Sequence, residues 1–376
     1  MGASVAGATK KKQRLTHVDC MRGVACILMF QTHAYDSWLG GQARLSDVAR
    51  WSQVASTLAA TSFLFLTGFS LALSVESLTR RGATPRAVVA AAVRRGGQIL
   101  LFALIFRGQE FVWRTHGPWT NFFRVDVLNV IGVSIALMGS ICWIVSRAKR
   151  GLAAAAMAMC IAMLTPLLWT TWRPRFLPWY LESYINGVHI FKEPQPWLFP
   201  IFPWAAFCFA GLAAGSFLRS EWAERRGGTA IAMTAWAGLL VAVGALRLDA
   251  LPIQLYRVYD FWHTSPNFFL VRIGLLLELL AACYLWSLHQ GSEWFFNRIV
   301  QLGQNSLLVY WVHIWFVYGG FSILPKQASS VSSATAGLVG IIAAMMLLAW
   351  ARPWIGEQAK EWAGWVKGKL LPAGEF

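Results

Sequence analysis

The sequence predicts an all-α, polytopic integral membrane protein with about ten transmembrane helices. Three observations predict it. Of the 376 residues, 57% are hydrophobic and only 13% are charged, and the mean hydropathy is +0.49. Apolar stretches of about 20 residues, the length of helix that crosses a bilayer, recur along the chain. The Lys and Arg residues gather in short connections between these stretches, as membrane topology requires.

The predicted spans follow one another with short connections. The first starts at about residue 18, and the nine that follow cover residues 53–75, 97–113, 126–146, 151–171, 198–218, 228–246, 267–288, 303–323 and 333–351. Residues 18–351 are therefore predicted to form one transmembrane domain. Residues 1–17 form a basic cytoplasmic segment, and residues 352–376 are predicted to form an amphipathic tail on the inner membrane surface. We expect the first span to be retained, because it is long and has no small-residue cleavage site.

The cations predict the orientation. Of the 33 Lys and Arg residues, twenty fall on the side that holds residue 1 and eleven on the other side, and Arg22 and Arg272 lie inside spans. The positive-inside rule therefore predicts that both termini are cytoplasmic, in the inner membrane if the protein is bacterial. The net charge of +16 would point to nucleic acid in a soluble protein. Here the positions of the Lys and Arg residues are explained by the orientation of the protein in the membrane. The predicted partner is therefore the lipid bilayer and not nucleic acid.

The sequence contains none of the common cofactor motifs. There is no soluble domain, no Gly-rich phosphate loop and no metal-ligand spacing, so no metal is predicted. The six cysteines each lie in or beside an apolar segment without paired spacing, which predicts buried thiols. The stretch from Ser62 to Ser74 mixes hydroxyl side chains and Gly68 into an apolar run, which we interpret as close helix packing.

The first span carries a polar stripe. At about 100° per residue, Asp19, Arg22, Cys26, Met29 and His33 fall on one helix face, with roughly 16 Å of rise between Arg22 and His33. Charges in lipid are costly, so this face must look into protein or a wet cavity. Asp19 and Arg22 are spaced to form an i, i+3 ion pair.

Later spans also carry polar residues. Asp126 opens the fourth span, and Arg272 lies in the eighth. Ser306, Tyr310 and His313 follow Asn305 at positions that share one face of a helix. These residues are the remaining candidates for chemistry inside the membrane.

Six short motifs connect these residues to a known group. The first is D-x-x-R-G with a histidine eleven residues after the arginine, formed by Asp19, Arg22, Gly23 and His33. The others are FLFLTGFSL (63–71), DVLNVIGVS (126–134), PIFPWAAFCFAGLAAG (200–215), SPNFFLVRIG (265–274) and GQNSLLVYWVH (303–313). Together they resemble the transmembrane acyltransferase superfamily, which includes the acyltransferase 3 proteins. The motifs DVLNVIGVS and PIFPWAAFCFAGLAAG favour the heparan-alpha-glucosaminide N-acetyltransferase-like branch of this superfamily.

The resemblance implies an enzyme that moves an acyl group, commonly acetyl, from cytoplasmic acyl-CoA to a glycan or amino sugar across the membrane. It also implies that His33 is the catalytic residue. The chain departs from the lysosomal relatives, because it lacks their luminal domain and the Trp-Asn-Gly piece after the first span. The sequence leaves open whether the product is an amide or an ester and how long the acyl group is. It is compatible with direct transfer and with an acyl-histidine intermediate, and it indicates no particular oligomeric state.

The chemistry of acyl transfer assigns roles to the polar residues. A neutral imidazole at His33 can act as a base or a nucleophile near pH 7. An acidic side chain should orient it, and Asp36 and Asp126 are the candidates. The developing oxyanion needs a donor, which Asn305, Ser306, Tyr310 or His313 could supply.

Donor binding is predicted for the buried cations. Arg22, with its partner Asp19, and Arg272 are the candidate residues for acetyl-CoA or another acyl-CoA. Arg22 could instead serve only its ion pair with Asp19. His33 could likewise be a satisfied polar residue at a helix end. The alternative function is a transporter, in which the buried Asp, Arg and His side chains form a proton relay or substrate site.

Overall fold

The computed structural model describes residues 15–113, 122, 124–172, 174–187, 199–253, 255–289 and 293–370. In these residues the regular structure is helical; no strand occurs there, and Leu39 and Ser329 form one isolated bridge. The all-α fold class is confirmed. Most of the predicted basic segment 1–17 lies outside the described residues.

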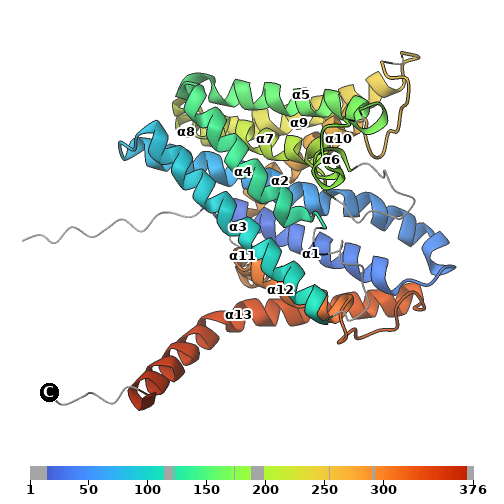
Figure 1. The fold of residues 1–376 in the computed structure, drawn as a ribbon, viewed down its shortest axis with the longest axis vertical. Coiled ribbons are helices and arrows are strands. Elements are labelled where there is room, and N and C mark those ends of the chain that lie inside the picture. The colour runs from blue at the N-terminus through green and yellow to red at the C-terminus, as the bar shows by residue number, and fades with distance from the viewer. Residues whose placement is uncertain are drawn as a thin grey trace, which may run out of the picture.

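The helices follow in chain order and are labelled in Figure 1. They are α1 (Thr16–Trp38), α2 (Asp47–Arg80), α3 (Pro85–Trp113), α4 (Val127–Ile144), α5 (Arg150–Thr170), α6 (Trp179–Asn186), α7 (Ile201–Leu218), α8 (Glu221–Arg225), α9 (Gly227–Asp249), α10 (Pro266–Leu288), α11 (Glu293–Gln304), α12 (Ser306–Val317) and α13 (Val331–Leu370). Short 3-10 turns at Ala43–Leu45 and Arg147–Lys149 lead into α2 and α5.

Eight of the described helices are long and apolar enough to cross a membrane: α2, α3, α4, α5, α7, α9, α10 and α13. The chain is therefore a polytopic integral membrane protein. The helix α1 has 23 residues, but its polar stripe keeps its hydropathy below that of the eight. The predicted span 303–323 is not one helix, because the chain breaks at Asn305 between α11 and α12. The count of ten crossings and the cytoplasmic termini remain predictions.

Helix starts follow local capping rules. The hydroxyl of Ser46 accepts a hydrogen bond from the Ala49 amide at the start of α2. Ser265 caps α10 in the same way, and Pro266 occupies the first helical position, where its missing N–H costs nothing.

At the other end of the chain, α13 continues through Pro353 to Leu370. The predicted tail is thus helical and continuous with the last predicted span.

Glycines let α2 approach α7 and let α1 approach α11. A Cβ on Gly68 would overlap the Cys208 carbonyl of α7, and one on Gly303 would overlap the Asp19 carbonyl of α1. Such close approach is typical of helices packed inside membranes. The packing of α1 against α11 places the polar stripe of α1 beside the break at Asn305.

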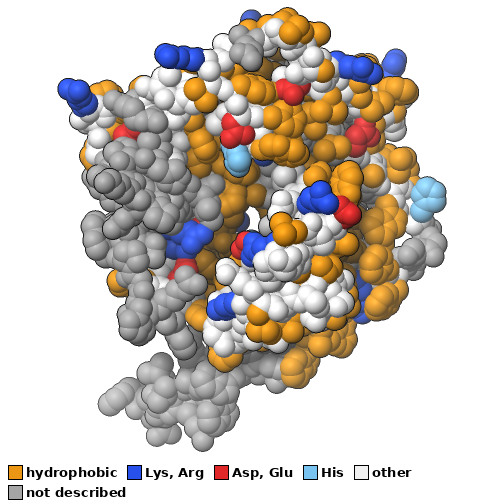
Figure 2. Space-filling view, turned by 90° about the vertical axis from the view of Figure 1, so that its right-hand side faces the viewer, with side chains coloured by type: hydrophobic (Ala, Val, Ile, Leu, Met, Phe, Trp, Pro, Cys, Tyr) orange, Lys and Arg blue, Asp and Glu red, His pale blue; other side chains and the backbone are white. Residues whose placement is uncertain are grey.

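In Figure 1, α5, α7, α9 and α10 lie at the top, α1 crosses the middle, and α13 runs along the bottom. The end at the left of Figure 1, where α2 ends and α3 begins, carries a network of ion pairs. There Glu76 binds Arg80 and Arg147, and Glu224 binds Arg80 and Arg219. We call this the basic end; it is the predicted cytoplasmic side. Figure 2 faces the opposite end, where acidic and basic side chains lie interspersed with hydrophobic ones.

Candidate functional site

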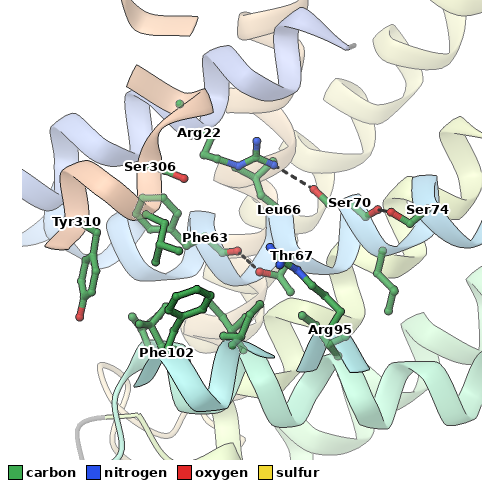
Figure 3. A pocket seen from close by; sticks show the side chains of 18 of the residues that line it. Arg22, Phe63, Leu66, Thr67, Ser70, Ser74, Arg95, Phe102, Ser306 and Tyr310 are labelled. Carbon is green, nitrogen blue, oxygen red and sulfur yellow. Dashed lines mark hydrogen bonds between the residues drawn. The ribbon is translucent and has the colours of Figure 1, made fainter. Parts of the chain in front are cut away.

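A cavity of about 830 Å³ opens between α1, α2, α3, α4 and the α11–α12 junction. We call it the first cavity, and Figure 3 shows it from close by. Its polar lining includes three arginines from three helices, Arg22 of α1, Arg95 of α3 and Arg352 of α13. Such a set of cations suits a ligand with several negative charges.

The arginines differ in their partners. Arg22 donates to the Asp19 carboxylate over 2.7 Å and to the Ser70 hydroxyl over 3.1 Å, so the predicted pair of Asp19 and Arg22 is confirmed. Among the described residues, neither Arg95 nor Arg352 has a carboxylate within 4.0 Å. Arg95 and Arg352 can therefore neutralise negative charges of a ligand in the cavity.

The break at Asn305 gives the cavity a helix N-terminus. The Asn305 side chain donates to the Gln301 carbonyl over 2.7 Å, which closes α11, and it accepts from Arg352 over 2.6 Å. Residues 303–308 line the cavity. The amides of the first turn of α12 have no partner within their own helix, so the cavity wall is electropositive at this point.

His33 lies one helical turn beyond Met29, which lines the cavity. The Nδ1 atom of His33 lies 2.8 Å from Nε2 of His313, and the two rings are nearly parallel, with 5.1 Å between centroids. The Nδ1 atom of His313 lies 2.8 Å from the Val309 carbonyl oxygen, and His313 is fully buried. The pair joins α1 to α12.

These two contacts determine the protonation of both rings. A carbonyl oxygen only accepts, so Nδ1 of His313 carries a proton and, in the neutral ring, its Nε2 is an acceptor. His33 must then donate from Nδ1, which leaves the lone pair of His33 on Nε2. The site thus presents one basic nitrogen at a fixed position.

The two predicted acidic partners do not contact His33. Asp36 lies one turn further on but points outwards; it accepts from the Tyr318 hydroxyl over 2.7 Å and lies 3.9 Å from Arg44. Tyr318 in turn packs edge-on against His33. Asp126 is buried because it neutralises Arg107, which also binds Glu110. The histidine at position 313 takes the place that an acidic side chain was expected to take.

The predicted oxyanion donors divide into two groups. Figure 3 places Ser306 and Tyr310 at the end of the first cavity away from Ser74. The Tyr310 ring lies 5.9 Å from that of His313, so it stands between the cavity and the histidine pair. Asn305 has both ends of its amide engaged, and His313 holds His33.

Arg272 lies away from the first cavity. Its guanidinium is caged by the rings of Phe268 at 4.2 Å and Phe207 at 4.9 Å, and its Nε donates to the Phe268 carbonyl over 3.3 Å. No carboxylate of a described residue lies within 4.0 Å, so cation–π contacts stabilise the charge. Of the residues predicted to bind the donor, Arg22 lines the cavity and Asp19 holds Arg22, whereas Arg272 does neither.

Several lining residues were not predicted from the sequence. Thr67, Ser70 and Ser74 line the cavity on one face of α2, although their stretch was interpreted only as packing. The signal was available, because spacings of three and seven residues repeat on a helix face. Arg95 and Arg352 were counted only as topological cations. No group of three or more His, Cys, Asp or Glu side chains that could hold a metal ion occurs in the described part of the chain.

Comparison with known proteins identifies the family. The family model of heparan-alpha-glucosaminide N-acetyltransferase, catalytic, matches residues 14–254, which is more than half of the chain. The match includes His33, Arg22 and the α2 wall of the first cavity, whereas α12 with His313 follows it. No curated protein matches the chain.

Proposed function

The chain belongs to the heparan-alpha-glucosaminide N-acetyltransferase catalytic family and is a membrane acetyltransferase, and from this premise we propose its substrates and mechanism. The donor is acetyl-CoA, or another acyl-CoA, bound in the first cavity from the basic end. The acceptor is a hydroxyl or amine of a glycan or amino sugar that approaches from the opposite side of the membrane. His33 is the catalytic base.

The hydrogen-bonded chain from His33 through His313 to the Val309 carbonyl carries this proposal. His33 Nε2 takes the proton of the acceptor as the acceptor atom attacks the thioester carbonyl. The carbon–sulfur bond then breaks, and the proton on Nε2 passes to the sulfur of CoA, which restores the neutral ring. Throughout, the Nδ1–H of His33 stays bonded to His313, so the ring keeps its orientation.

The first cavity suits the donor along its length. Arg22, Arg95 and Arg352 lie where phosphate groups need cations, and the N-terminus of α12 adds favourable amides. The hydroxyl protons of Thr67 and Ser74 are used within α2, which leaves their oxygens as acceptors for the amide N–H groups of the pantetheine arm. This arm must span roughly 16 Å along α1 from Arg22 to His33.

Tyr310 is the residue best placed to stabilise the oxyanion. It lines the first cavity and its ring lies beside the histidine pair. A phenolic hydroxyl that donates to the developing negative charge would act most strongly in such a water-poor site. Ser306, one turn earlier on the same face of α12, lies closer to the cationic part of the cavity, where it would contact the donor.

Label transfer in detergent tests the proposed function. We expect the purified chain to move label from acetyl-CoA to glucosamine-ended oligosaccharides, which a transporter without a gradient would not do. His33→Ala is expected to lower turnover by about 10²- to 10⁴-fold with little change in CoA binding, because a positioned base acts mainly on the chemical step.

His289→Ala is the matched control, since His289 is exposed at the end of α10 and its Nδ1 lies 2.9 Å from the Leu285 carbonyl oxygen of the same helix. It should keep normal turnover. A His33→Ala protein with near-full turnover would overturn the catalytic assignment. If His33→Ala also loses CoA binding, His33 has a structural role.

A further inference from the structure

A second cavity, of about 1020 Å³, lies between α5, α7, α9 and α10, which lie together at the top of Figure 1. The helix α2 separates the two cavities: Leu66 and Ser70 line the first, whereas Phe65 and Ala72 line the second. His33 and His313 line neither of them. The other residues with roles in the proposed reaction, Arg22, Arg95, Arg352 and Tyr310, line the first cavity and not the second.

Small side chains create this space. Alanines of α5, α7 and α9, among them Ala155, Ala213 and Ala237, form much of the wall. Two of the larger lining residues, Leu152 and Met233, are 75% and 48% exposed, so the cavity opens sideways where the bilayer would be. From Arg150 to Met159 the lining of α5 rises roughly 14 Å, about half of a hydrocarbon core of about 30 Å. The apolar part thus has the depth of one leaflet.

A buried cation stands at the basic end of this cavity. Arg150 lines it and is only 9% exposed. Its Nε atom is buried without a hydrogen-bond partner, and no carboxylate of a described residue lies within 4.0 Å. An unpaired guanidinium in such a place is costly unless an anion accompanies it.

The other charges at this mouth largely neutralise one another. Arg147 binds Glu76 over 2.5 Å, and Arg219 binds Glu224 over 2.9 Å. Glu221 lines the mouth as well but is exposed to solvent. The unsatisfied positive charge therefore lies on Arg150, directly below the apolar walls.

We propose that the second cavity binds a glycerophospholipid with an anionic headgroup, from the leaflet at the basic end. The headgroup phosphate pairs with Arg150, and an acyl chain lies along the alanine-rich walls of α5 and α7. Binding at this site requires both the anionic headgroup and the acyl chain of the lipid. A free phosphate lacks the chain that fills the cavity, and a zwitterionic lipid carries its own cation beside the phosphate.

Thermal unfolding of the full chain in mild detergent tests this site. Dioleoyl phosphatidylglycerol is expected to raise the melting temperature by about 3 °C or more. Dioleoyl phosphatidylcholine and inorganic phosphate at equal concentration should give less than a third of that rise. Arg150→Gln should lose the response to phosphatidylglycerol, and without lipid it should be no less stable than wild type, because it removes an unpaired buried charge. Arg86→Gln is the matched control, an exposed arginine of α3 at the same end, and it should respond as wild type does.

An equal phosphatidylglycerol response in Arg150→Gln and Arg86→Gln would overturn the proposal, as would a full response to inorganic phosphate or to phosphatidylcholine. A second variant, Ala155→Trp, fills the apolar wall and leaves Arg150 in place. It should weaken the phosphatidylglycerol response, and native mass spectrometry should show less bound phospholipid than in wild type. If Ala155→Trp retains the full amount, no acyl chain lies in the cavity and the proposal fails.

Discussion

The two cavities resemble each other at the basic end and differ inside the membrane. Both are of similar size, both carry arginines, and they lie on opposite faces of α2. In the first cavity, hydroxyl side chains and the N-terminus of α12 continue the polar lining towards the histidine pair. Beyond Arg150, the walls of the second cavity are mostly alanine and larger apolar side chains.

This difference is the reason that we place the proposed chemistry beside the first cavity and not the second. Arginines at a membrane surface attract anions of many kinds and do not distinguish an enzyme site from a lipid site. A polar path from arginines to a buried histidine is costly inside a membrane, and polar residues in such places generally mark functional sites. Four predictions use the comparison, from the largest expected effect to the smallest.

The first concerns His313, which contacts His33 beyond the Tyr310 end of the first cavity. His313→Ala removes the acceptor for His33 Nδ1–H and should lower kcat by about 10²-fold or more, with KM for acetyl-CoA nearly unchanged. His313→Gln can accept from His33 and donate to the Val309 carbonyl, so it should recover most of the loss. Steady-state kinetics of the two variants side by side provide the measurement. Equal loss in both would show that His313 acts otherwise than by holding His33.

The second concerns the ion pair of Asp19 with Arg22, which lines the first cavity. Asp19→Ala leaves Arg22 partly buried without its carboxylate and should destabilise the protein by roughly 3 kcal/mol. Thermal unfolding without ligand measures it, and Asp47→Ala, which removes an exposed acid that forms an ion pair with Arg50, serves as the control. If Asp19→Ala unfolds at the wild-type temperature but binds CoA less tightly, the pair serves the donor more than the fold.

The third prediction tests whether CoA binds in the first cavity and not in the second. Arg95→Gln and Arg352→Gln each remove a cation from the first cavity and should weaken CoA binding by roughly 10- to 150-fold, since hydrogen bonds to charged groups contribute roughly 1.5–3 kcal/mol. Arg150→Gln lies in the other cavity and should leave CoA affinity within twofold of wild type. Titration of CoA into each purified variant gives the comparison. A large loss in Arg150→Gln would mean that the donor enters through the second cavity.

The smallest effect is expected at Ser70, whose hydroxyl accepts from Arg22 over 3.1 Å. Ser70→Ala removes this one bond and should weaken CoA binding by about threefold to tenfold, the usual net value of a hydrogen bond. Ser52→Ala, a change of the same kind at the far end of α2, is the control in the same titration. No difference between the two would exclude Ser70 from positioning Arg22.

Most of the fold could be predicted from hydropathy and from the spacing of residues within single helices. Hydropathy alone located the long apolar helices, because each buries its own backbone polar groups within about 20 residues. The pairing of Asp19 with Arg22 was also predictable, since the two lie one helical turn apart. The amphipathic helix α11, Glu293–Gln304, was missed because its polar face lowers the hydropathy that identifies spans.

The site depended on contacts that sequence spacing does not encode. His33 and His313 are 280 residues apart in the sequence, and they meet because α12, which begins after the break at Asn305, packs against α1. The expectation of an acidic partner for His33 came from general chemistry. It did not anticipate that Arg107 would require the Asp126 carboxylate for its own charge.

The break at Asn305 also bears on how far the acyl group must travel. The helix α12 has 12 residues and rises about 18 Å, well short of a hydrocarbon core of about 30 Å. A bilayer beside so short a helix is expected to adapt to this hydrophobic mismatch by thinning locally. Transfer at His33 would then cover only part of the ordinary membrane thickness, and CoA could enter and leave on one side without a rocking movement of the helices.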